Sequence, residues 1–289
     1  MVKKRLPFLL SVIIILAAAV NADADDPKVK KTSWVDWDDG VLIIDVEVDI
    51  AASTSPGKAR VAAEEYLRQT IGSIFCNALY ELNLDSYRSV KEAVEQDGRL
   101  LAALLELGRT ARPLNTYLNT TLDTLTARYV FRFYPDIIGV FARHTQPYDP
   151  IEILEYVPTM DYTGIVIYAK GEYPVHGEDP ARKNPEPFNP SLLPKLFTTE
   201  MEVVAEAAMM DPVYLSGWGT FGYTDSTDYL THKERVGAAP LFTLARAVFG
   251  DNRTDLLIPV DAARKIFATP GNRELIRQGR ILVICDTLN

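Results

Sequence analysis

The stretch WVDWDDGVLIIDVEVDI, residues 34–50, decides how the fold begins. Its centre, Asp38-Asp39-Gly40, favours a tight turn between two antiparallel strands. After the turn, apolar residues alternate with the acidic residues at 45, 47 and 49, which is typical of a strand with one buried and one solvated face. We therefore expect a β-hairpin over residues 29–50, with Asp45, Glu47 and Asp49 in a line on its solvated face.

Helical patterns follow this hairpin. Ser55-Pro56 is a helix start signal, and apolar residues from Val61 to Leu82 recur at helical spacing. This pattern predicts a helix of about 25 residues with a wide apolar stripe. A second helix is expected over residues 89–107, ending at Gly108, and residues 126–133 have the composition of a strand.

The second half of the chain interleaves strands and helices. Its clearest buried strand is TGIVIYAK, residues 163–170, which follows a proline-containing connector at 146–158. Six prolines predict a long, exposed loop over 171–194. Further strands are expected at 213–223, 254–259 and 280–286 and helices at 240–249 and 260–267, while 196–208 fits either a strand or a helix.

The mixed order of these elements predicts an α+β or mixed α/β fold without internal repeats. The connector suggests two regions. Residues 28–150 would form a hairpin-plus-helices region, and residues 151–289 an α/β region.

The N-terminus has the three-part pattern of a secretory signal peptide. A basic start (Lys3, Lys4, Arg5) precedes an apolar tract at 6–20 and the small-residue site Val20-Asn21-Ala22. The tract of 15 residues is shorter than the ~20 that a membrane span needs. We expect a signal peptide at 1–22 and an exported protein in the periplasm or at the outer membrane. An uncleaved anchor is the alternative, and no lipid anchor is expected because no cysteine lies near the cleavage site.

The composition of the chain argues against several classes of protein function. Without residues 1–22 the chain keeps 267 residues, with 27 basic against 39 acidic side chains, a net charge of −12. This charge disfavours binding to nucleic acid or to anionic lipid. A hydrophobic content of 47% excludes a disordered protein. Cys76 and Cys285 are the two cysteines, and they would either form a disulfide or remain as two buried thiols.

No motif in the sequence indicates catalysis. Residues 217–222, GWGTFG, match GxGxxG, but no helical pattern follows them, and a bent strand is the simpler interpretation. His144, His176 and His232 lack the spacing of metal ligands, and no serine-nucleophile motif is present. We therefore expect a non-enzymatic protein without cofactor or metal, although folding could still bring together a pair of carboxylates as in a hydrolase.

The order of several segments resembles the secreted lipoprotein-20-like family, which includes FlgP-type flagellar outer-membrane proteins. The segments are WDDGVLI (37–43), KARVAAEEYL (58–67), PDIIG (135–139), YTGIVIYAKG (162–171), RVGAAPL (235–241), TDLLIPVDAARKI (254–266) and RILVICD (280–286). The resemblance implies a non-enzymatic envelope protein that assembles with others, sometimes around flagellar machinery. The chain departs from it in lacking a lipid-acceptor cysteine and in its longer insert at 171–194.

The leading hypothesis is thus a structural or interaction protein of the cell envelope, associated with motility. Its partners would be envelope or flagellar proteins or further copies of itself. The runner-up is a periplasmic module for a small ligand or glycan, with its pocket near 213–223. Candidate partner contacts are Trp34 and Trp37 near the hairpin turn, and His176, Pro185 and Pro187 in the proline-rich loop.

Overall fold

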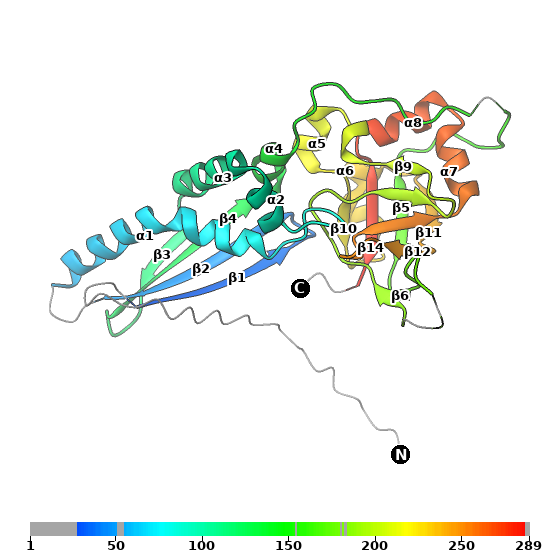
Figure 1. Cartoon of the computed structure of the whole chain (residues 1–289). Helices are drawn as coiled ribbons and strands as arrows, with labels where there is room; N and C mark the ends of the chain where they lie inside the picture. The colour runs from blue at the N-terminus through cyan, green and yellow to red at the C-terminus, as the bar shows by residue number, and fades with distance from the viewer. Residues whose placement is uncertain (1–27, 51–54, 154, 180, 182–183, 287–289) are drawn as a thin grey trace, which may run out of the picture.

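The computed structural model describes residues 28–50, 55–153, 155–179, 181 and 184–286, and it confirms the predicted α+β class. Two halves are visible in Figure 1: an N-terminal half (residues 28–141) and a C-terminal half (164–286). The residues between them, 142–153 and 155–163, include the connector expected at 146–158. The signal peptide expected at 1–22 lies outside the described residues.

The N-terminal half is built on the predicted hairpin. Its antiparallel sheet has the strand order β1-β2-β4-β3. The inner residues of β2 are Leu42, Ile44, Val46 and Val48, all buried, whereas the acidic positions between them face outward, as the alternation predicted. The strands are β1 (Val29–Asp36), β2 (Val41–Asp49), β3 (Asn115–Leu118) and β4 (Thr124–Arg132).

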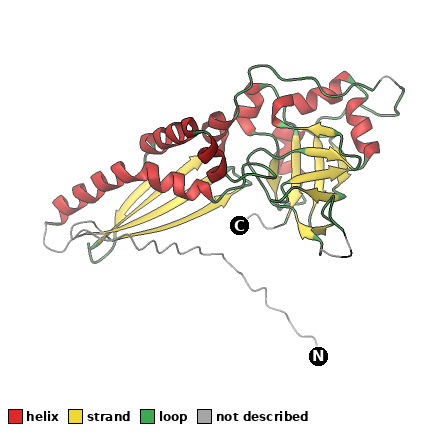
Figure 2. Cartoon of the chain, in the orientation of Figure 1, coloured by secondary structure: helices red, strands yellow, loops and turns green. Residues whose placement is uncertain are grey.

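Helices cover only the inner face of this sheet, as Figure 2 shows. Asp97 splits the single helix expected at 89–107, because its side chain accepts a hydrogen bond from the Arg99 backbone N–H and starts a new helix. Two glycines bring the long helices together: a Cβ on Gly108 would lie 2.7 Å from the Gly72 Cα. The helices are α1 (Pro56–Tyr80), α2 (Val90–Gln96), α3 (Gly98–Thr110) and α4 (Ile138–Phe141), the last after a π-turn at Phe133–Ile137.

The C-terminal half contains two four-stranded sheets. The first is parallel, with the order β10-β14-β5-β11, and the second has the order β12-β13-β8-β9. The strands are β5 (Ile165–Ala169), β8 (Leu196–Thr198), β9 (Val203–Ala205), β10 (Gly222–Thr224), β11 (Leu241–Leu244), β12 (Ala247–Phe249), β13 (Asp255–Ile258) and β14 (Ile281–Cys285), with β6 (Glu172–Tyr173) and β7 (Glu186–Pro187) as a separate pair.

Short helices pack on both faces of the parallel sheet. α7 and α8 cover the face that includes Ile165 and Ile167, and α6 covers part of the face that includes Val166 and Leu282. The helices are α5 (Pro212–Trp218), α6 (Lys233–Val236), α7 (Val260–Phe267) and α8 (Pro270–Arg277), with 3₁₀ turns at Ala207–Met209 and Tyr229–His232. No helix of the described residues is long and apolar enough to cross a bilayer.

Three expectations for this half are wrong. Residues 240–249 form strands β11 and β12 instead of a helix, because pairing with β5 and β13 outweighs the helical propensity of their leucines and alanines. Residues 213–223 begin as helix α5, which Asp211 caps and Pro212 starts. The 171–194 segment is not simply an exposed loop, since Val175, Phe188, Ser191 and Leu192 are buried.

Candidate functional site

The turn of the β1–β2 hairpin inserts between the two halves. The Trp37 ring lies 5.0 Å from the Phe133 ring and 5.4 Å from the Tyr223 ring, so it packs against both cores. Next to it, Asp38 pairs with His232 Nε2 at 3.1 Å and accepts a hydrogen bond from the Thr224 hydroxyl at 3.2 Å. Burial raises the pKa of Asp38, and the neighbouring His232 opposes that shift. Trp37 therefore stabilises the internal contact between the two halves.

Trp34, the other tryptophan expected to contact a partner, does reach the surface. It lies on the outer face of the sheet with 37% of its area exposed. The Arg128 guanidinium sits 5.2 Å from its ring centroid, and Arg128 also forms a two-bond ion pair with Asp45 at 2.7 Å. This side chain is held in place by a cation–π contact.

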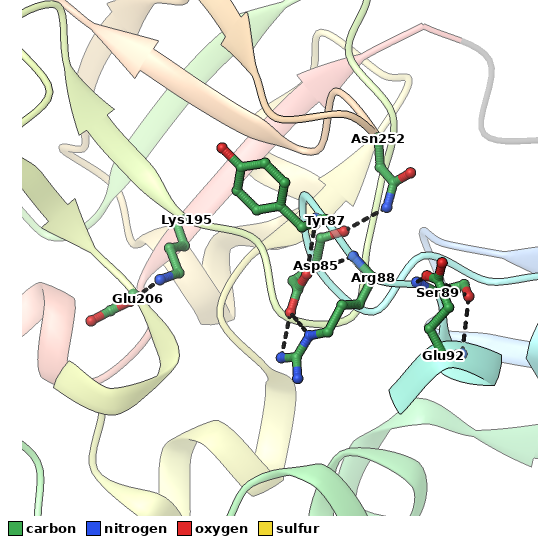
Figure 3. A network of polar contacts seen from close by, with 8 residues as sticks. All are labelled: Asp85, Tyr87, Arg88, Ser89, Glu92, Lys195, Glu206 and Asn252. Atoms are coloured by element: carbon green, nitrogen blue, oxygen red, sulfur yellow. Dashed lines mark hydrogen bonds and ion pairs between the residues drawn. The ribbon is translucent and has the colours of Figure 1, made fainter. Parts of the chain in front are cut away.

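A second joint between the halves is the loop before α2, shown in Figure 3. The Asp85 carboxylate accepts hydrogen bonds from the backbone N–H groups of Tyr87 and Arg88 at 3.0 and 2.9 Å and pairs with the Arg88 guanidinium. The Asn252 side chain donates to the Asp85 carbonyl at 3.0 Å, and the Asn252 backbone N–H donates to the Ser86 carbonyl at 2.9 Å. These bonds fix the loop to the C-terminal half.

Other contacts drawn in Figure 3 stabilise the surrounding elements. Ser89 and Glu92 form a capping box at the start of α2, with bonds of 2.7 and 3.2 Å. Lys195 pairs with Glu206 at 2.6 Å, and the Tyr148 hydroxyl donates to the same carboxylate. The network thus has the character of a structural joint.

Asp255 is the most perturbed carboxylate beside this joint. It is 1% exposed, and its Oδ1 accepts a hydrogen bond from the Lys195 backbone N–H at 2.8 Å. Its Oδ2 has no hydrogen-bond partner among the described residues. Burial raises the pKa of Asp255 to about 6, against the lowering effect of the Ser86 hydroxyl and the Lys195 backbone. No group of three or more potential metal ligands occurs in the described part of the chain.

The two cysteines do not pair. Cys76 lies in α1 within the N-terminal core, and Cys285 lies in β14 within the C-terminal core; both are free and buried. The helix-on-strand packing that could have joined them does not occur, because each belongs to a different core. Burial raises the pKa of Cys76 to about 11 and that of Cys285 to about 12, so neither forms the thiolate that a nucleophile needs.

The GxGxxG segment runs from a helix into a strand, which is the reverse of a dinucleotide site. Gly219 ends α5 with φ +73°, and Gly222 begins β10. The carbonyls of Trp218 and Gly219 accept hydrogen bonds from the Arg235 guanidinium at 2.6 and 3.0 Å. At this turn, backbone carbonyl oxygens accept hydrogen bonds from a cationic side chain. A phosphate site would instead need backbone N–H groups that donate hydrogen bonds to the ligand. The bent-strand interpretation is also wrong, since the first half of the motif is helical.

Two ion pairs attach the proline-rich segment 171–194 to Arg253. Arg253 pairs with Glu186 at 2.9 Å and with Glu178 at 3.1 Å. Of the contacts proposed from sequence, Pro185 and Pro187 are exposed. His176 is half-buried, and its ring lies 6.1 Å from that of Phe249.

An apolar surface that the sequence did not reveal lies at the edge of the parallel sheet. We call it the edge patch: Tyr168, Phe242 and Leu244, with exposed fractions of 40, 56 and 53%. Phe242 and Leu244 project from β11 on the same face, since they pair with Val166 and Tyr168 of β5. β11 ends the sheet order, and no strand pairs with its other edge among the described residues.

The edge patch was missed because a helix was expected at 240–249. The signal was a two-residue period: Leu241, Thr243 and Ala245 are buried, whereas Phe242, Leu244 and Arg246 are exposed. Because the exposed residues at 242 and 244 are themselves apolar, the hydropathy of the sequence does not show this alternation.

Comparison with known proteins divides the chain in the same region as the connector. Residues 28–140 match the family model for the N-terminal domain of Treponema pallidum Tp0624, and residues 164–287 match the model for its second domain. No curated protein gave a match. Neither model carries the name of the lipoprotein-20-like family. Over most of its length, the chain is therefore similar to the N-terminal and second domains of the spirochete protein Tp0624, in that order.

Proposed function

We propose that the protein is an exported, non-enzymatic component of the cell envelope that binds another envelope protein through the edge patch. The patch supports this role because parallel sheets are normally covered on both faces. Here α6 and the turn before it cover only part of one face, and three large apolar side chains stay exposed on it. Exposed apolar patches of this kind typically mark protein-binding surfaces.

The finer parts of the proposal rest on the sequence. Export to the periplasm or the outer membrane follows from the signal pattern at 1–22, and the flagellar association follows from the lipoprotein-20-like resemblance. The sequence-based alternative, a ligand pocket near 213–223, gains no support, since Phe221 and Tyr223 of that segment are buried in the core.

The test compares the protein lacking residues 1–22 with its Phe242→Lys/Leu244→Lys variant. Two lysines in the patch should abolish co-purification of an envelope partner after cross-linking. Val61→Lys is the matched control, because Val61 is an apolar residue of α1 that is 65% exposed. Equal partner recovery with the patch variant and the control would contradict the proposal.

A further inference from the structure

Strand β11 leaves one side of its backbone open at the end of the parallel sheet. The N–H groups of Leu241 and Ala245 donate hydrogen bonds to carbonyls in and next to β5, at 2.8 and 2.9 Å. Because the backbone groups of successive residues in a strand point to alternate sides, those of Phe242 and Leu244 point away from β5. No strand pairs with this edge among the described residues. The edge therefore offers two N–H donors and two carbonyl acceptors to a further strand.

The following strand, β12, shows how this chain covers such an edge. An extended segment lies along its outer side: the Val248 N–H donates to the Pro174 carbonyl at 3.1 Å, and the His176 N–H donates to the Val248 carbonyl at 2.8 Å. This contact is strand addition by a short extended segment. In the described part of the chain, no corresponding segment pairs with the outer side of β11.

The size of the edge patch favours a single added strand over a folded surface. The exposed portions of Tyr168, Phe242 and Leu244 together amount to roughly 300 Å². A standard interface between two folded proteins uses about 800 Å² on each side. A short extended segment needs less apolar area, because its backbone hydrogen bonds supply part of the binding.

The charge beside the patch adds a requirement for the occupant. Arg246 continues the exposed alternation of Phe242 and Leu244, and it forms no ion pair with another described residue. A complementary strand would place apolar side chains beside 242 and 244 and a carboxylate beside Arg246. A second copy of the chain fits less well, because the antiparallel register that uses all four backbone groups places Pro240 beside Arg246.

We propose that the open edge of β11 binds an extended segment of the partner protein as a fifth, parallel strand. The segment carries apolar residues at two alternate positions and an acidic residue two positions further on. Parallel pairing is expected because every strand pair of this sheet is parallel. This inference rests on the proposed binding through the edge patch and specifies the form of the partner's contact.

The probe is a peptide from β14, which has the required pattern in Leu282, Ile284 and Asp286. A fluorescein-labelled peptide of residues 279–286 with Cys285→Ser is added to the protein lacking residues 1–22. We expect saturable binding in fluorescence anisotropy, with a dissociation constant on the order of 100 μM. Absence of saturable binding up to about 1 mM would overturn the inference.

Two substitutions of Leu244 separate backbone pairing from apolar contact. Leu244→Pro should weaken peptide binding about ten-fold or more, because proline lacks the N–H that points to the open edge. Proline is tolerated at an edge position whose N–H does not serve the sheet. Leu244→Ala keeps that N–H but loses more apolar surface, and it should weaken binding less. An equal or larger loss with Leu244→Ala would show that side chains alone bind the peptide, which would overturn strand addition.

The acidic requirement is tested without altering the strand's backbone groups. Arg246→Glu should weaken binding of the probe several-fold and should have little effect on a peptide that also carries Asp286→Asn. Arg112→Glu, at an exposed arginine of the N-terminal half, should change neither affinity. Equal affinity of the two peptides for the original protein would overturn the requirement. These variants keep the test decisive if Leu244→Pro does not fold, which circular dichroism of each variant checks.

The same variants distinguish failure of this inference from failure of the proposed function. Partner recovery that is lost with Phe242→Lys/Leu244→Lys but retained with Leu244→Pro would overturn strand addition and leave the edge patch as the binding surface. Partner recovery that both variants retain would contradict the proposed function itself. A dimer in sedimentation velocity that Leu244→Pro abolishes would identify a second copy as the occupant and overturn the assignment of the partner.

Discussion

Gly219 shows how one residue can exclude a function that a motif suggests. Its φ of +73° is unfavourable for other residues, and an added Cβ would overlap the Tyr134 ring. The glycine is thus required for the turn out of α5 and for packing against the N-terminal half. A phosphate-binding role is not needed to explain it.

We predict that Gly219→Ala lowers the free energy of unfolding by about 2 kcal/mol or more, because it combines backbone strain with overpacking. Gly217→Ala should be neutral or slightly stabilising, since Gly217 lies in α5 with open space around a Cβ. Denaturant unfolding measures both. If the two variants were equally destabilised, this account of the turn would be wrong.

Asp255 makes stability depend on pH. Its pKa is about 6 in the folded protein against 3.8 for the free side chain, so folding favours its protonated form. The stabilising effect of that proton is therefore complete below the unfolded pKa and is lost as pH rises through the folded pKa.

Between about pH 4 and pH 7, we expect the original protein to lose up to about 3 kcal/mol relative to Asp255→Asn. The asparagine does not titrate, so the difference between the two unfolding free energies isolates this one group. Urea unfolding at both ends of the range is the measurement. A constant difference across the range would show that the carboxylate is not enclosed as described.

Among the elements, those with a single strong pattern were predictable from sequence. The hairpin, α1, β13, α7 and β14 lie where turn residues, a capped apolar stripe or a short apolar run place them. α8 was not predicted because a run beginning Pro270-Gly271-Asn272 indicates a turn, yet Pro270 is its first residue and the Thr269 side chain caps it. β11 was mistaken because its exposed positions are as apolar as its buried ones.

In the candidate site, too, only features with a local sequence pattern could be predicted. Exposed Trp34 could be identified from the hairpin alternation, but the position of Trp37 depends on Phe133 and Tyr223, which lie far away in sequence. The separation of Cys76 from Cys285 likewise depends on which core each element joins. Contacts that require the tertiary fold leave no local pattern.

The contact between α1 and α3 provides a prediction at this scale. Gly108→Ala should cost about 1–3 kcal/mol of unfolding free energy, because the methyl group would press on Gly72 and on the Phe75 ring at 3.0 Å. Gly98→Ala is the control in the same helix, since nothing lies within 4 Å of its Cβ position. Thermal unfolding of the pair should show a lower transition temperature for the first variant alone.

In the whole molecule, several contacts join the two cores, and Leu192, Met210 and Leu215 of the C-terminal half are buried in the N-terminal core. Trp37 touches both, the Asp38–His232 pair lies next to it, and the loop around Asp85 adds hydrogen bonds to Asn252. We expect the two halves to unfold together as long as these joints are intact.

Trp37→Ala should therefore do more than lower stability by about 3 kcal/mol. It should split one unfolding transition into two in a calorimetric scan, because each half keeps its own core. Trp34→Ala, on the same strand pair but on the outer face, should leave a single transition. One unbroken transition in both variants would mean that the remaining joints suffice for cooperativity.

The direction of β1 determines which end of the N-terminal half lies farthest from the C-terminal half. The strand places its turn against the C-terminal half, so Val29 lies at the opposite end, about 24 Å away for seven residue steps. Any tether acting through the polypeptide upstream of residue 28 would pull on the remote end of the N-terminal half (Figure 1). The N-terminal half would then act as a spacer that holds the edge patch away from the point of attachment.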